Sequence, residues 1–296
     1  MDSKRTGVIA IIGCSLMWAI EAVLAKKAYA SAGVLQTAAT RVGVASVTGL
    51  LYVLLTKPKR IFGVTKRDLS ALLYIALVGT VLADLLYLYA LTEVPILNAV
   101  LIAHLQPIFI VIIGFLLPHK DKLTGFDCLG ILTMIIAGLL VTTSTLENLL
   151  NLKFGTAADL YVVLATLSWA TASIVAKNYI SHVDAAVITF YRFLLSALAL
   201  TAYVSMTSAL VVSNAYQVIL GITTGIGFIL FYEGLKRIKA AQAAALELTS
   251  PFFAAVLGFM WLQEIPTVMQ LLGVVTVFLG IHFLSKRENV HRFDMK

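Results

Sequence analysis

Ten long apolar runs constrain the fold of this chain more than any other feature of its sequence. A helix needs about 20 mostly apolar residues to cross the hydrocarbon core of a bilayer. The runs lie near residues 7–29, 34–55, 69–91, 95–117, 125–143, 156–179, 184–206, 215–235, 240–262 and 267–285. The segments between them are short and leave no room for a separate soluble domain. We therefore expect an all-α integral membrane protein with ten transmembrane helices.

The composition agrees with this expectation. Hydrophobic residues make up 60% of the chain and charged residues 12%, which is too little polar surface for a soluble globule of 296 residues. Strands of a membrane barrel alternate in polarity over about ten residues, whereas these runs are longer and continuously apolar. The first run resembles a signal peptide, but Glu21, Lys26 and Lys27 interrupt it. We expect it to remain as a transmembrane helix.

The positions of lysine and arginine predict that both termini are cytoplasmic. With the N-terminus inside, 17 of the 22 lysines and arginines are cytoplasmic, Lys26, Lys27 and Lys153 are outside, and Arg41 and Arg192 lie within runs. We expect a multi-pass protein of the cell (cytoplasmic) membrane. The net charge of +7 follows from this topology and from attraction to anionic membrane lipids. It gives no reason to expect a nucleic acid as partner.

The chain contains an internal repeat. At an offset of 151 Trp18 matches Trp169 and Arg41 matches Arg192, and beyond the second run an offset of 144 matches Pro107 with Pro251. A longer loop after the second run of the first half accounts for the change of offset. The sequence therefore predicts a duplicated five-helix unit.

The repeat predicts how the chain is organised. We expect a first repeat over residues 1–145, a second over 152–287 and a short cytoplasmic tail over 288–296. Since five is an odd number, the second repeat would enter the membrane from the opposite side, which makes the repeats inverted. Inverted repeats favour a transporter, because two halves of one fold and opposite orientation can exchange conformations around a central site.

Several stretches of the sequence resemble a known family. They are LYLYALTEVPILNAVLIAHLQPIF in the first half, and FYEGLKRIKAAQAAALELTSPFF and GFMWLQEIPTVMQLLGVVTVFLG in the second. Over essentially its whole length the chain resembles the EamA-type permeases of the drug/metabolite transporter superfamily. In that family the fourth helix of a repeat carries a proline and ends near an acidic residue. Pro251 and Glu264 fit this pattern, whereas the first half has Pro107 followed by Pro118-His119-Lys120-Asp121.

The resemblance implies an architecture and a function. It implies ten helices, with a central cavity lined by the first four helices of each half and with the fifth helices at the periphery. It also implies movement of small metabolites, often amino acids or amphipathic compounds and commonly outward.

Charged residues within the first four runs are the first candidates for a site. A charge in mid-membrane costs at least about 2.5 kcal/mol on insertion scales, so it usually faces a partner or a wet cavity. From a helix rise of about 1.5 Å per residue, Glu21, Arg41, Asp84 and His104 all lie roughly 10 to 14 Å below the outer face. We expect Arg41 to pair with Glu21 first and with Asp84 second.

In the second half the same estimate places Arg192 and Glu247 at one level near the inner face, so we expect these two to pair. Such pairs could serve only to neutralise charge and fix helix packing, or they could bind substrate or act in gating. Both interpretations stay open. Two acids beside Arg41 leave a surplus carboxylate, which favours a cationic or zwitterionic substrate and could also bind a coupling proton.

Aromatic and polar residues complete the candidate site. Trp18 lies three residues before Glu21 and therefore on the same helix face, where a ring beside a carboxylate suits an ammonium group. His104 and Gln106 precede a proline, which frees a backbone carbonyl that can line a cavity. The predicted substrate-binding residues are Trp18, Glu21, Arg41, Tyr87, His104, Gln106, Trp169, Arg192, Glu247 and Thr249.

The leading hypothesis is a secondary active transporter that works by alternating access and moves amino acids or organic amines, as an exporter or an exchanger. A channel or a lipid-interacting membrane scaffold is the alternative. An intramembrane enzyme is disfavoured, because the sequence has no paired-histidine metal motif and no evident Ser–His pair at one depth. Cys14 and Cys128 give no metal spacing, so we expect neither cofactor nor metal. The expected oligomeric state is a monomer or a homodimer.

Overall fold

A computed structural model describes residues 3–56, 58–60, 63–116, 125–152, 155–207, 211–238, 243, 246–247 and 249–290. Within these residues there are helices and no strands. Seven of the described helical spans are long and apolar enough to cross a membrane. Two of these spans, Lys66–Ala90 and Ile96–Leu116, consist of more than one helical segment. Three shorter apolar helices cover 128–143, 249–262 and 268–283. The predicted all-α membrane fold with ten apolar helical segments is confirmed. Residues 291–296 of the expected tail, and the stretch 118–121, lie outside the described residues.

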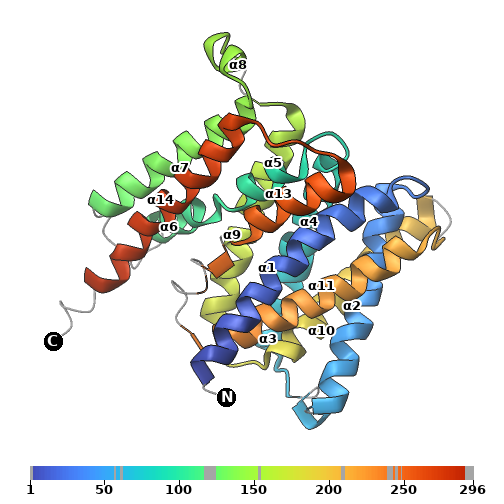
Figure 1. Cartoon of the computed structure of the whole chain (residues 1–296). Coiled ribbons are helices and arrows are strands. Elements are labelled where there is room, and N and C mark those ends of the chain that lie inside the picture. The colour runs from blue at the N-terminus through green and yellow to red at the C-terminus, as the bar shows by residue number, and fades with distance from the viewer. Residues whose placement is uncertain are drawn as a thin grey trace.

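The first half runs from α1 to α8 and the second from α9 to α14 (Figure 1). The helices of the first half are α1 (Ser3–Ala28), α2 (Val34–Thr56), the 3-10 turn η1 (Pro58–Arg60), α3 (Lys66–Ala76), the π-helical segment η2 (Leu77–Leu82), α4 (Ala83–Ala90), α5 (Ile96–Ala103), α6 (Gln106–Leu116), α7 (Gly125–Thr143) and the short α8 (Leu146–Leu150). Those of the second half are α9 (Ala157–Tyr179), α10 (Ala185–Thr207), α11 (Ala215–Leu235), α13 (Thr249–Leu262) and α14 (Val268–Val290).

Two spans begin at capping boxes that can be read in the sequence. Thr65 precedes α3, and its hydroxyl accepts a hydrogen bond from the Asp68 amide at 3.2 Å while the Asp68 carboxylate accepts one from the Thr65 amide at 2.9 Å. Thr156 and Asp159 repeat the arrangement at the start of α9. Each box satisfies backbone donors that the first turn of a helix leaves without partners.

The fourth span is broken in its middle. α5 ends at Ala103, His104 and Leu105 form a turn, and α6 begins at Gln106. Pro107 explains the break, because its ring has no N–H and clashes with the carbonyl group four residues earlier. The break places the His104 ring between two carbonyl oxygens, with Nδ1 2.7 Å from that of Val100 and Nε2 3.0 Å from that of Glu247.

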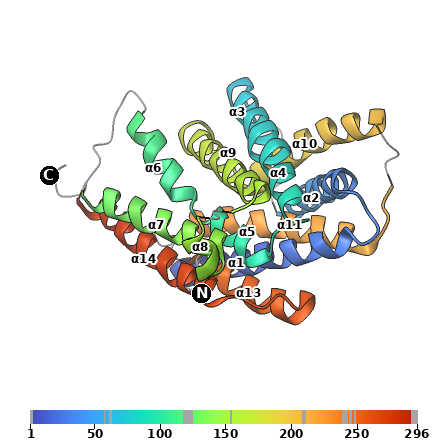
Figure 2. The ribbon, with the colours of Figure 1, turned by 90° about the horizontal axis from the view of Figure 1, so that it is seen from above.

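The first three spans of one half pack against the first three spans of the other half. α1 lies on α11, α2 lies on α10 and α11, and the span made of α3, η2 and α4 lies on α9. Glycines allow the closest approach, since a Cβ atom on Gly221 would lie 2.8 Å from the Arg41 carbonyl oxygen of α2. α7 and α14, the fifth helices, lie side by side away from this centre (Figures 1 and 2). Their peripheral position agrees with the family resemblance.

Candidate functional site

Arg41 is the centre of a buried charge cluster between the two halves. Only 6% of the residue is exposed. Its Nη1 donates to Asp84 Oδ2 at 2.6 Å and its Nη2 to Glu21 Oε2 at 2.9 Å, while its Nε donates to the Thr224 hydroxyl at 2.9 Å. Both predicted acidic partners are confirmed, and they bind the arginine at the same time. The contact with Asp84 is the shorter one, although Glu21 was expected to rank first.

The carboxylate of Asp84 extends this cluster to two predicted aromatic residues. The indole N–H of Trp169 donates to Asp84 Oδ1 at 3.0 Å. The ring of Tyr87 lies 5.4 Å from the ring of Trp169, measured between centroids. Asp84 therefore has both oxygens satisfied, one by Arg41 and one by Trp169.

Glu21 has only one oxygen satisfied. Its Oε2 binds Arg41, but its buried Oε1 has no hydrogen-bond partner within the described part of the chain. Gly227 of α11 faces this atom, since a Cβ atom there would lie 3.6 Å from Oε1 and 3.7 Å from Trp18 Cδ1. The missing side chain at Gly227 thus leaves space beside both Glu21 and Trp18.

Arg192 makes a different set of contacts. The residue is 5% exposed, its Nε donates to the Thr80 hydroxyl at 2.6 Å and its Nη2 to the Gly79 carbonyl oxygen at 2.7 Å. Its Cζ lies 4.2 Å from the centre of the Phe228 ring, a cation–π contact. The predicted ion pair with Glu247 is wrong, because the guanidinium is turned toward η2 of the opposite half.

Arg41 and Arg192 nevertheless contact residues at equivalent positions of the repeat. At the offset of 144, Thr80 corresponds to Thr224. Arg41 donates to Thr224 and Arg192 donates to Thr80, so each arginine binds the equivalent threonine of the opposite half. The same offset relates Asp84 to Phe228, which are the neighbours of Arg41 and Arg192 respectively.

The tryptophans follow the same relation. Trp169 packs on Tyr87 with 5.4 Å between ring centroids, and Trp18 packs on Phe231, which is 144 residues after Tyr87, with 5.5 Å. The ring centroid of Trp18 also lies 6.4 Å from that of Phe228. Phe228 is the repeat equivalent of Asp84, to which Trp169 donates a hydrogen bond. Thr80, Thr224, Phe228 and Phe231 were not among the residues predicted from the sequence. The signal that could have found them is the offset itself.

Four predicted residues lie apart from the arginines. Gln106 Nε2 donates to the Ser173 hydroxyl at 2.9 Å, between α6 and α9. Thr249 donates to the Leu246 carbonyl oxygen at 2.7 Å and lines an otherwise apolar cleft of about 450 Å³ between α13 and α14. The His104 ring contacts the backbone of Glu247, whose carboxylate forms no ion pair with any described residue.

An ion pair between Lys26 and Glu264 joins the two halves at the end of α1. Lys26 Nζ donates to Glu264 Oε1 and to the Val94 carbonyl oxygen, both at 2.6 Å, and the Ile96 amide donates to Glu264 Oε2 at 2.7 Å. Glu264 therefore ties the end of α1 to the start of α5. Lys26 was expected only as an outer charge, and its contact with Glu264 was not predicted.

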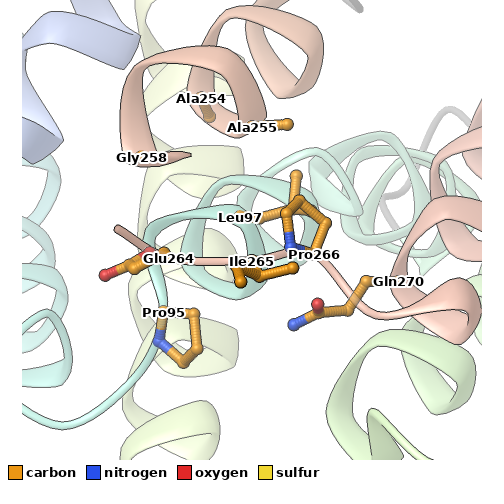
Figure 3. A pocket seen from close by; sticks show the side chains of 9 residues that line it. All are labelled: Pro95, Leu97, Ala254, Ala255, Gly258, Glu264, Ile265, Pro266 and Gln270. Atoms are coloured by element: carbon orange, nitrogen blue, oxygen red, sulfur yellow. The ribbon is translucent and has the colours of Figure 1, made fainter. Parts of the chain in front are cut away.

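A small cavity lies beside Glu264, and Figure 3 shows the nine side chains that line it, from Pro95 at one side to Gln270 at the other. Its volume of about 10 Å³ has room for no more than roughly one water molecule. Among the described residues no group of three or more His, Cys, Asp or Glu is placed to hold a metal ion. The residues around Arg41 and Arg192 offer ion pairs, hydrogen bonds and aromatic faces.

Comparison with known proteins relates the chain to transporters. The model of the EamA-like transporter family matches residues 5–143 and 156–286. A transporter of Methanothermobacter thermautotrophicus is 25% identical, and the match covers 75% of this chain and 66% of that protein, just under two thirds of its length. The riboflavin transporter ImpX of Fusobacterium nucleatum is 25% identical, and the match covers 77% of this chain and 80% of the length of ImpX.

A solved crystal structure shares the fold. The match covers 96% of this chain and 98% of the chain in that structure, with a TM-score of 0.65 and 15% sequence identity. At this identity the likeness shows the fold alone.

Proposed function

Since the chain belongs to the EamA-like transporter family, we propose that this membrane protein is a secondary active transporter that works by alternating access. Its proposed substrates are small metabolites such as amino acids or organic amines, which it moves across the cytoplasmic membrane as an exporter or an exchanger. Membership of a transporter family indicates a transporter rather than an enzyme.

The reciprocal contacts of the two arginines carry this proposal. Arg41 of the first half donates to Thr224 of the second, and Arg192 of the second half donates to Thr80 of the first. Matching contacts of this kind suit two repeats that exchange conformations about a shared site. In the proposed topology the repeats are inverted and both termini are cytoplasmic. A reporter fused after Lys296 tests this, and an extracytoplasmic signal would contradict it.

The proposed substrate site is the buried region between the halves. Trp18, Glu21, Arg41, Tyr87, Trp169 and Arg192 belong to its charged and aromatic centre, and we assign His104, Gln106, Glu247 and Thr249 to its margins. Cysteines at positions 18 and 87 should be protected from labelling by bound substrate. Cysteines at the exposed positions Leu132 of α7 and Leu279 of α14 are the matched controls and should not be protected.

Counterflow in proteoliposomes tests the function itself. A thermal-shift screen against amino acids, amines and riboflavin, the last chosen because ImpX is named for it, first selects a compound that binds. Uptake of that labelled compound should accelerate when unlabelled compound is loaded on the opposite side. Uptake that is equally fast in both preparations would indicate a channel. Absence of uptake for every compound that binds would contradict the transporter proposal.

A further inference from the structure

We propose that the cluster of Glu21, Arg41 and Asp84 is a proton-binding site, and that Glu21 Oε1 is the atom that takes the proton. The inference deepens the proposed function, on which it rests, by naming where a coupling proton would bind.

The cluster holds one more acid than base. Two carboxylates bind one guanidinium, at 2.6 and 2.9 Å, and the side chains of Glu21, Arg41 and Asp84 are 11%, 7% and 7% exposed. With both acids ionised the cluster carries one net negative charge in the middle of the membrane, where an uncompensated charge is costly. One bound proton makes the cluster neutral.

The hydrogen bonds of the two acids indicate which oxygen takes the proton. Asp84 Oδ2 accepts from Arg41 and Asp84 Oδ1 accepts from Trp169. Glu21 Oε2 accepts from Arg41, whereas the buried Glu21 Oε1 accepts no hydrogen bond from any residue that the structure describes, because the nearby Thr224 hydroxyl donates to the Leu220 carbonyl oxygen at 2.9 Å. Protonating Asp84 would disrupt an existing contact, since each of its oxygens already accepts a hydrogen bond. Protonating Glu21 at Oε1 disrupts none.

Within the residues that the structure describes, the second half of the molecule holds its buried arginine without an acid. Arg192 is as deeply buried as Arg41, yet a threonine, a carbonyl oxygen and a phenylalanine ring hold it, with no carboxylate among the described residues. This fold can therefore hold a buried arginine at this position without an acid. The positions of Glu21 and Asp84 correspond to Ala172 and Phe228 in the second half. The two acids are an addition to the first half rather than a requirement of the repeat.

Few other titratable groups face Glu21. Cys14 of α1 lies within electrostatic reach of both Glu21 and Glu247, and Tyr87 of α4 lies within reach of Glu21. α11 presents Thr224 and Gly227 to the cluster, and the helices α5 and α13 contain no titratable side chain. Glu247 is consequently the competing carboxylate that a test must separate from the cluster.

The binding step is a simple protonation. A proton from water adds to Oε1, an O–H bond forms, and the Glu21 carboxylate becomes a neutral carboxylic acid while its contact with Arg41 loses its ionic character. Release reverses the step. A carrier that alternates between these two states moves its substrate at a rate that depends on pH.

Infrared difference spectroscopy of the purified full-length protein after a pH jump detects this proton directly. We expect a carbonyl band of a protonated carboxyl group in the wild type. Glu247→Gln is the matched control and should retain a band, because it removes the other buried carboxyl group and leaves the cluster intact. In that Glu247→Gln background Glu21→Gln should remove the band, and so should Asp84→Asn, because either change leaves one acid on one arginine. A band that disappears in Glu247→Gln alone, or that persists when Glu21→Gln is added to it, would overturn the proposal.

Trp169→Phe separates the two acids within the cluster. In this variant the carbonyl band of the protonated carboxyl group should keep the wild-type frequency if the proton is on Glu21. The band should shift if the proton is on Asp84, because Asp84 Oδ1 accepts a hydrogen bond from the Trp169 indole. A shift would overturn the assignment to Glu21. The band is measured without transport, so its absence in a protein with normal counterflow rejects the proton site alone. Its presence in a protein without counterflow rejects the transporter proposal alone.

Discussion

Arg41 and Arg192 have matching positions in the two repeats, but acidic side chains surround the first and neutral groups surround the second. Each is buried and donates from Nε to a threonine of the other half. Beyond that contact Arg41 binds two carboxylates, whereas Arg192 binds a carbonyl oxygen and lies over an aromatic ring. The difference separates what the repeat needs for its packing from what only one half adds.

The energetic consequence is an unequal cost of losing each arginine. Around Arg192 the partners are neutral, so its removal leaves a hydroxyl and a carbonyl oxygen without a donor. Around Arg41 the partners are two buried carboxyl groups, so its removal leaves Glu21 and Asp84 without their cation. Orphaned buried charges are the more expensive defect.

The largest expected effect is that of Arg41→Gln. It should lower the free energy of unfolding by about 3–5 kcal/mol, because it leaves Glu21 and Asp84 without their cation. Chemical unfolding in detergent, followed by circular dichroism, measures the loss. Adding Glu21→Gln and Asp84→Asn to the same protein should recover most of it. A loss no larger than that of Arg192→Gln would break the comparison.

Arg192→Gln should have a smaller effect. We expect a loss of about 1–3 kcal/mol, the cost of leaving buried polar groups of Thr80 and Gly79 unsatisfied. The same unfolding measurement gives the value. Thr80→Val added to Arg192→Gln should cost little more, since the hydroxyl has then already lost its donor. A loss as large as that of Arg41→Gln would imply an acidic partner for Arg192.

Phe228→Leu should have the smallest effect. It removes the ring over which the guanidinium of Arg192 lies, a contact worth about 0.5–2 kcal/mol. A double-mutant cycle with Arg192→Gln isolates this contact from the loss of packing volume. We expect the effect of Phe228→Leu to shrink when Arg192 is absent. Equal effects in both backgrounds would show that the ring only fills space.

The sequence predicted the spans and the contacts of Arg41 for physical reasons. Apolar runs of membrane length define helices, and counting residues along the first three spans places Glu21, Arg41 and Asp84 at one depth. All three belong to the same half, so no knowledge of how the halves pack was needed.

The contacts of Arg192 could not be predicted in the same way. Its partners Thr80 and Phe228 come from two different halves, and depth alone suggested Glu247 because no rule of helix rise says which way a side chain turns. The Lys26–Glu264 pair also joins the two halves and was overlooked for the same reason. Applying the 144-residue offset to Thr224 would have pointed to Thr80, but only after one of the two contacts was known.

The central claim is that the surplus carboxylate of the first half serves transport rather than packing, and Glu21→Gln tests it most directly. The variant keeps the Arg41–Asp84 ion pair, so its free energy of unfolding should stay within about 1 kcal/mol of wild type. Counterflow measured across a pH series should lose the pH dependence that wild-type protein shows. Reduced stability together with an unchanged pH profile would contradict the claim and make Glu21 a structural partner of Arg41.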